Sequence, residues 1–252
     1  MNREALETSI KTALEKGDQA ELEHLSKEAV KNYPEDPFGY AYLAEALLMN
    51  SPIPYNEAEL CLAKASQLAP QDTGYLAQFA SLKSDQGEEG LAQILWGKIL
   101  GMEPNHLEAL VAKGDYQLNV LEDYPAAIAF FDRSIQYQMD HTPSYLYRAK
   151  SYLKLKEYDR ALKDFNHALQ LTDGVADAPM LRLQLGIMIG LNEPQGMIDA
   201  YRAILAIVPD NPQFHVNCAD QLVLLGRHEE AAQHYGKGLA LLGAEEPSIA
   251  YL

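Results

Sequence analysis

The sequence predicts an all-α protein in which helical hairpins stack side by side. Apolar residues recur three and four positions apart along most segments, which is the periodicity of a helix that buries one face. Prolines follow apolar segments at a regular interval, with 36 residues from Pro34 to Pro70 and 34 from Pro70 to Pro104. Small and aromatic residues return at the same places within that interval, which indicates an internal repeat.

The repeat divides the chain into seven units of about 34 residues. Continued from Pro104, the interval passes Met139 and Asp173 and reaches Pro209. Short insertions are expected near Ser51, near Asn119 and around Gly174. The predicted units span 3–36, 37–72, 73–106, 107–141, 142–175, 176–211 and 212–245, followed by a tail over 246–252, all within a single domain over residues 1–252.

Each unit is expected to hold two antiparallel helices. A turn between them is indicated by Gly17-Asp18, Gly87, Lys156-Glu157 and Gly226, because glycine and polar residues interrupt helical patterns. The second helix is expected to end before the proline, which cannot continue the hydrogen-bond ladder.

The fifth unit shows the repeated positions most clearly, and the other units share them in part. They are small residues where helix backbones approach closely and bulky residues that fill the adjoining space: Tyr145, Ala149, Tyr152, Tyr158, Ala161 and Phe165 in unit five; Tyr40, Ala44 and Ala58 in unit two; Ala80, Gly87, Ala92 and Trp96 in unit three; Gly114, Ala127 and Phe131 in unit four; Ala219, Gly226, Ala231 and Tyr235 in unit seven. Unit one, with Leu22 and Ser26, and unit six, with Gly186 and Tyr201, depart most. A single hairpin cannot bury its apolar surface, so neighbouring hairpins must stack.

This pattern resembles the tetratricopeptide repeat, in which a large residue, a Leu-Gly pair, a tyrosine, Ala-x3-Phe and a proline recur at fixed spacing. The resemblance covers residues 3 to about 245. It implies a right-handed superhelical α-α solenoid whose first helices line a concave groove. It also implies a non-enzymatic adaptor or scaffold that binds a peptide or partner helix there.

The resemblance assigns groove positions on the first helix of each unit. Tyrosines and amides there can hydrogen-bond a peptide backbone, while apolar positions form side-chain pockets. The candidate groove residues are Tyr42, Asp115, Asn119, Tyr147, Lys150, Lys154 and Asn217.

Unit five carries an unusual charge for this chain. It has six basic residues against four acidic ones, while every other unit is net negative. Lys150 and Lys154 are four residues apart and should project from one helix face. Together with Tyr147 they could bind a carboxylate. The alternative is that these lysines are solvated and serve solubility.

Composition excludes several classes of partner. The chain has 20 basic and 36 acidic residues and a net charge of −16, which disfavours nucleic acid and anionic membranes. RNA binding by helical repeats would need a hidden basic stripe. No apolar run is long enough to span a bilayer, and the N-terminus lacks the pattern of a secretory signal. Cys61 and Cys218 are interpreted as buried thiols, and the expected compartment is the cytosol.

No motif in the sequence indicates catalysis, a cofactor or a metal. Phosphate loops, G-x-S-x-G, H-E-x-x-H and C-x-x-C are absent. His228 and His234 are six residues apart and should lie on different helix faces, so no shared metal is expected. Trp96 is predicted to lie in the core, and His215 to pack or face solvent.

One known binding mode of the family can be set aside, and alternatives remain for self-association and for the C-terminal segment. The carboxylate clamp of some tetratricopeptide co-chaperones is not predicted, because Lys150 stands where the clamp has asparagine and no further unit follows the one with Asn217 to supply the clamp's lysine and arginine. The chain could instead be a structural module that self-associates and so forms a homo-oligomer. The segment 244–252 could extend a capping helix or lie in a neighbour's groove.

Overall fold

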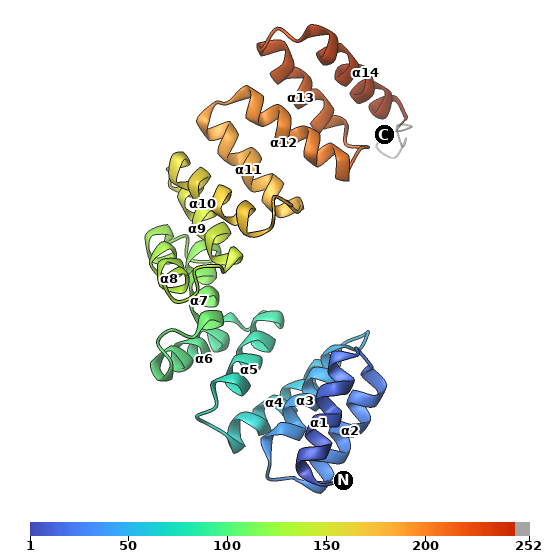
Figure 1. The fold of residues 1–252 in the computed structure, drawn as a ribbon, viewed down its shortest axis with the longest axis vertical. Coiled ribbons are helices and arrows are strands. Elements are labelled where there is room, and N and C mark those ends of the chain that lie inside the picture. Colours follow the sequence, from blue (N-terminus) through green and yellow to red (C-terminus); the bar gives the residue numbers. More distant parts are fainter. Residues whose placement is uncertain (245–252) are drawn as a thin grey trace, which may run out of the picture. The chain divides into compact units, whose positions relative to one another are not determined.

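The computed structural model describes residues 1–244, in which the chain forms fourteen α-helices and no strand (Figure 1). The predicted all-α fold is therefore confirmed. The predicted tail over 246–252 lies outside the described residues. The helices are α1 (Arg3–Glu15), α2 (Gln19–Asn32), α3 (Pro37–Leu48), α4 (Tyr55–Leu68), α5 (Thr73–Asp85), α6 (Glu89–Met102), α7 (Leu107–Asn119), α8 (Tyr124–Tyr137), α9 (Thr142–Lys154), α10 (Tyr158–Leu171), α11 (Ala178–Leu191), α12 (Pro194–Ile207), α13 (Pro212–Leu224) and α14 (His228–Ala244).

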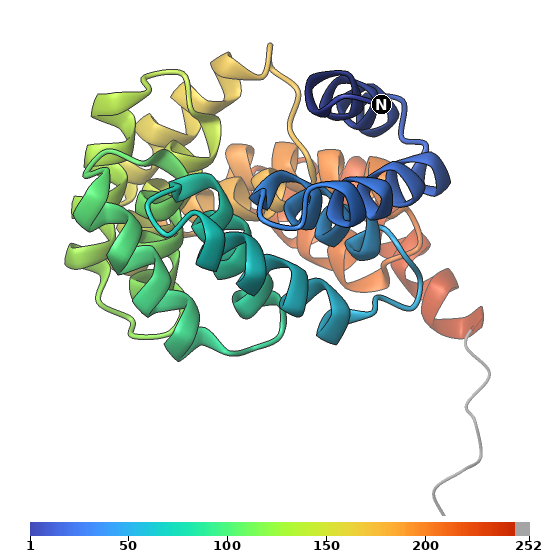
Figure 2. The same ribbon diagram turned by 90° about the horizontal axis from the view of Figure 1, so that it is seen from below.

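Consecutive helices pair into hairpins, and each pair falls within one of the seven ranges given above. The last pair, α13 and α14, lies side by side in both views (Figures 1 and 2). The helix pairs that pack closely are neighbours along the chain, apart from α9 with α11. This is the packing expected when each hairpin buries its apolar face on the next one.

Polar caps and prolines set where the helices begin and end. Side chains that accept a hydrogen bond from a backbone N–H in the first turn precede several first helices: Asp36, Asp72, Asp177 and Asn211. Such caps satisfy donors that have no partner inside the helix. The second helices α2, α4, α6 and α12 each end two residues before a proline, as predicted.

The turn inside most hairpins contains a residue in the left-handed region. Glycine supplies it at Gly17, Gly87 and Gly226, with φ of 66°, 77° and 70°. In the fifth hairpin Lys156 occupies the same place with φ 61°. This conformation costs free energy for a residue with a Cβ atom, because the Cβ atom clashes with the residue's own backbone.

We expect Lys156→Gly to raise the free energy of unfolding by about 1 kcal/mol, because glycine adopts the left-handed conformation without that clash. Urea unfolding followed by circular dichroism measures the change. The matched control is Lys163→Gly on the exposed side of α10, which should lower stability by about 1 kcal/mol because glycine is a poor helix former. Equal losses in both variants would contradict the role given to this turn.

The chain forms two compact units, Met1–Lys113 and a second one that begins at Gly114. We call them unit I and unit II, and from here on each of the seven repeats is called a hairpin. In unit I, Trp96 is only 2% exposed and packs with Ala92, Ile99 and Ala109, so its predicted core position is confirmed. A single domain over residues 1–252 stays a prediction.

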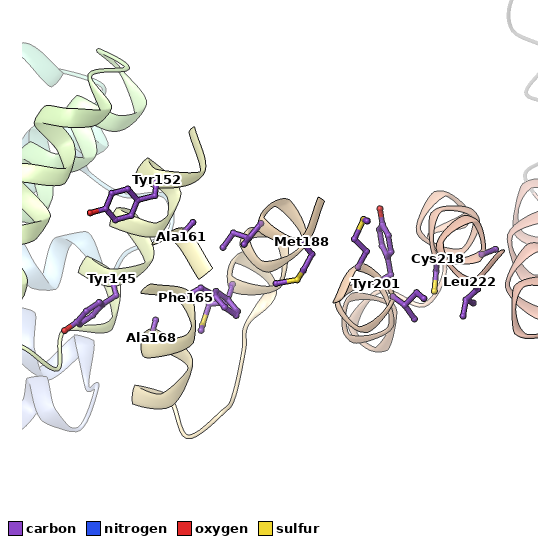
Figure 3. Close-up of a cluster of buried hydrophobic side chains, with 14 of the residues drawn as sticks. Tyr145, Tyr152, Ala161, Phe165, Ala168, Met188, Tyr201, Cys218 and Leu222 are labelled. Atoms are coloured by element: carbon purple, nitrogen blue, oxygen red, sulfur yellow. The ribbon is translucent and has the colours of Figure 1, made fainter. Parts of the chain in front are cut away.

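The core of unit II runs from Ile135 of α8 to Ala231 of α14, and Figure 3 shows part of it. Phe165 and the small residues Ala161 and Ala168 are all buried in this core, as the repeat predicts. Cys218 is fully buried in this core. The expectation for Cys61 was wrong, because its thiol is only partly buried at the edge of a cluster around Leu47 and Leu62 in unit I.

Candidate functional site

A hollow of about 550 Å³ opens between α9 and α11 in unit II. Both helices are the first of their hairpins. The residues that line it are Pro143, Leu146, Tyr147, Lys150, Leu153, Lys154, Pro179, Met180, Arg182 and Leu183.

The two helices present equivalent residues to this hollow because they begin in the same way. Pro143 and Pro179 each occupy the first turn of their helix, where the missing N–H costs nothing and the fixed φ favours helix. Gly186 then lets α11 approach α9, since a Cβ atom built on it would lie 3.0 Å from a methyl of Leu153.

The floor of the hollow is apolar and its edge is basic. Leu146, Leu153 and Leu183 are half-buried, so their side chains still offer surface to a ligand. The basic groups are Lys150, Lys154 and Arg182. This arrangement can hold an apolar side chain and pair a carboxylate beside it.

Lys150 is held by hydrogen bonds that reach α7. Its Nζ donates to Oδ1 of Asn119 at 2.8 Å, and Nδ2 of Asn119 donates to Oδ1 of Asp115. The side-chain amide of Asn119 thus orients the ammonium of Lys150, which also lines the hollow.

Tyr147 is positioned by the core beneath it. Its ring stacks on Phe131, with centroids 5.5 Å apart and planes 11° from parallel. Burial, and then the charge of Asp115, raise the pKa of Tyr147. Its hydroxyl is therefore protonated near neutral pH and can donate a hydrogen bond to a bound carbonyl or carboxylate.

The structure brings five of the seven predicted groove residues together. Tyr147, Lys150 and Lys154 line the hollow, and Asn119 and Asp115 are joined to it through Lys150.

The other two predicted residues lie elsewhere. Tyr42 belongs to unit I, where it packs against the cluster around Leu6 and Ile10, and burial raises its pKa. Asn217 lies on α13, accepts a hydrogen bond from Gln213 at 2.7 Å and does not line the hollow.

Sequence reasoning missed Arg182, Met180 and Leu183. The connection before α11 is longer than the other connections between hairpins and contains two residues in the left-handed region, Asp173 and Gly174. The residues of α11 therefore do not fall at the positions that the repeat interval assigns to them. The signal that could have found them is Asp177 followed by Pro179, a helix cap and first-turn proline that fix where α11 begins.

Among residues 1–244 no cluster of three or more His, Cys, Asp or Glu side chains could hold a metal ion. Over the same residues no helix is both long and apolar enough to cross a bilayer.

Residues 143–174 match the family model of the tetratricopeptide repeat. This segment covers α9 and α10, whose first helix forms one wall of the hollow. No curated protein matches the chain in sequence.

Several solved structures share the fold. A tetratricopeptide repeat protein from Parabacteroides merdae is 19% identical with a TM-score of 0.65, over 97% of this chain and 94% of that one. PilF of Pseudomonas aeruginosa is 15% identical with a TM-score of 0.72, over 82% and 92%. A chain of the anaphase-promoting-complex hetero-tetramer Cut9–Hcn1 is 17% identical with a TM-score of 0.67, and the match covers 98% of this chain and 47% of that one.

Proposed function

Because this chain is a tetratricopeptide-repeat protein, we propose that it is a non-enzymatic adaptor that binds a segment of a partner protein in the hollow between α9 and α11. The observation that carries the proposal is the apolar floor of Leu146, Leu153 and Leu183 beneath three basic side chains, in a chain of net charge −16.

The chemistry of the hollow selects the kind of segment. An extended peptide can place one large apolar side chain on the leucines, and burial of such a side chain contributes roughly 1.5–3 kcal/mol. An Asp or Glu beside it can pair with Lys150 or Arg182. The charge of the chain as a whole is screened beyond a Debye length of about 8 Å at physiological salt, so only side chains at the hollow would attract this acidic residue.

The solved neighbours support a role in protein assemblies in general. One is the Cut9–Hcn1 hetero-tetramer, in which a protein of this fold has a protein partner. Another is PilW, a type IV pilus biogenesis factor.

Charge reversal at the hollow is expected to abolish peptide selection. Selection of a random phage-displayed peptide library on the full chain should enrich peptides with Asp or Glu next to a large apolar residue. Lys150→Glu combined with Arg182→Glu should reduce binding of an enriched peptide at least tenfold, because two attractive contacts become repulsive. Fluorescence polarisation of the labelled peptide measures the loss.

The matched control is Lys163→Glu on α10, an exposed lysine that does not line the hollow. It should bind the peptide as the unchanged chain does, and circular dichroism should show full helicity in all variants. Enrichment of the same peptides by the doubly reversed variant would refute the assignment of this hollow.

Self-association is the second proposal, and the last hairpin favours it. Leu224 of α13 and Leu239 of α14 are 69% and 68% exposed, whereas Leu169, at the position of Leu239 in the fifth hairpin, packs against the neighbouring core. A second copy could cover these leucines. Sedimentation at several concentrations separates the two proposals, since a strictly monomeric chain removes this one.

A further inference from the structure

Two histidines meet between the helices of the last hairpin. Nδ1 of His215 on α13 lies 3.1 Å from Nδ1 of His234 on α14. Nε2 of His215 lies 3.0 Å from the carbonyl oxygen of Pro209, in the connection between α12 and α13. His215 is 6% exposed. The pair therefore joins three parts of the chain at a largely buried point.

The partners of these nitrogens determine where the protons are. A carbonyl oxygen only accepts, so Nε2 of His215 carries a hydrogen and its Nδ1 is the acceptor when the ring is neutral. Nδ1 of His234 must then be the donor, and its Nε2 is left without a hydrogen, 3.9 Å from Sγ of Cys218. The neutral pair thus has one consistent arrangement of hydrogens.

Protonation disturbs this arrangement in two steps. A first proton can bind Nε2 of His234, which keeps the hydrogen bond between the rings but places a positive charge beside the buried ring of His215. A second proton leaves N–H facing N–H across 3.1 Å, and the hydrogen bond between the rings is lost. Both steps oppose the packing of α14 on α13.

The charged groups around the pair come from every element that packs against it. Arg202 of α12 and Lys237 of α14 disfavour a positive charge on His234, while Glu230 of α14 favours one. Asp210, in the connection before α13, lines the same hollow. Glu230 forms ion pairs with Arg202 and Arg227, which weakens its attraction for a positive charge on the histidine pair. A hollow of about 520 Å³, lined by both histidines, gives water access to the pair.

The pKa of His234 is consistent with this balance. Burial lowers it, the neighbouring His215, Arg202 and Lys237 lower it further, and Glu230 opposes them. The unfolded chain, where a histidine has a pKa near 6.5, therefore takes up protons at a higher pH than the folded chain. The stability that the pair contributes is present above that pH and decreases as pH falls below it.

We propose that His215 and His234 form a proton-sensitive latch that holds α14 against α13 at neutral pH and releases it in mild acid. Release uncovers the face of α13 that carries Cys218, Ala219 and Leu222, which is buried in the closed hairpin. The latch lies away from the peptide hollow between α9 and α11, so it does not depend on the proposed adaptor function.

Hydrogen exchange of the full chain at pH 7.5 and pH 5.0 tests the latch. After correction for intrinsic exchange rates, protection of the α14 amides should fall about tenfold relative to those of α10. His234→Asn should remove this difference, because the asparagine amide can still donate to Nδ1 of His215 but does not titrate. His228→Asn, an exposed position on the same helix, should behave as the unchanged chain does.

Equal protection of α14 at both pH values, or an undiminished fall in His234→Asn, overturns the proposal. If the asparagine variant does not close the last hairpin, long-range ¹H–¹⁵N spectra of the unchanged chain decide at pH 7.5. His215 must show the Nε2–H tautomer and His234 the Nδ1–H tautomer. Any other pair of tautomers rules out the latch.

Discussion

Replacement of Arg148 by alanine is expected to lower the free energy of unfolding of unit II by about 3–5 kcal/mol, because it leaves a buried carboxylate without its partner. Nε and Nη2 of Arg148 donate to the two oxygens of Asp164 at 2.7 Å each, and Nη1 donates to Asp132 at 2.6 Å. Asp164 is only 5% exposed. One side chain of α9 thus joins α8 and α10.

The pKa of Arg148 reflects the same contacts. Burial lowers it, but the hydrogen bonds and charges of Asp164 and Asp132 raise it by more, so it lies above its ordinary value. Arg148 is therefore charged at every pH at which the protein folds.

Urea unfolding followed by circular dichroism measures the loss, and two further variants interpret it. Arg160→Ala removes an exposed ion pair with Glu157 and should cost at most about 1 kcal/mol. Arg148→Ala combined with Asp164→Ala should recover part of the stability, because no buried charge is left unpaired. If Arg148→Ala costs no more than Arg160→Ala, the three-helix contact does not contribute as described.

Replacement of Phe131 by alanine is expected to cost about 3–5 kcal/mol and to weaken peptide binding as well. Phe131 is fully buried, and large-to-small changes at such sites lose transfer free energy and leave a cavity. Gly114 packs against its ring so closely that a Cβ atom would lie 2.5 Å from Cε1. The ring also stacks beneath Tyr147, so its loss should leave the tyrosine free to move.

Phe131→Leu keeps more of the volume and should cost less stability while it still removes the aromatic contact with Tyr147. Thermal unfolding gives the stability of both variants, and polarisation of the labelled peptide gives their affinity at a temperature where each is folded. Unchanged affinity in folded Phe131→Ala would show that the stacking does not position Tyr147.

The elements of this fold follow from local chemistry, which is why most of them could be predicted. Pro34, Pro70, Pro104 and Pro209 fix where second helices end, since a proline ring acts on its own segment alone. The sixth hairpin was harder because the connection around Gly174 is longer than the other connections between hairpins. The period indicates an insertion there but not the residue at which α11 begins.

The site could be predicted only in part for the same reason. Lys150 and Lys154 lie on one helix, so their spacing determines their common face. Arg182 meets them across a helix–helix contact whose register depends on the lengthened connection. His215 and His234 meet across α13 and α14, and sequence spacing carries no information on such a pair. The right-handed superhelix and one groove along the whole chain stay predictions.

The close packing of helices that are neighbours along the chain also bears on how the protein is made. Contacts between segments that are close in sequence need only short loops to be closed, and proteins rich in them fold quickly. Each hairpin that leaves the ribosome finds the surface it needs on the hairpin made just before it. We therefore expect folding to keep pace with synthesis, without a wait for the carboxyl end of the polypeptide.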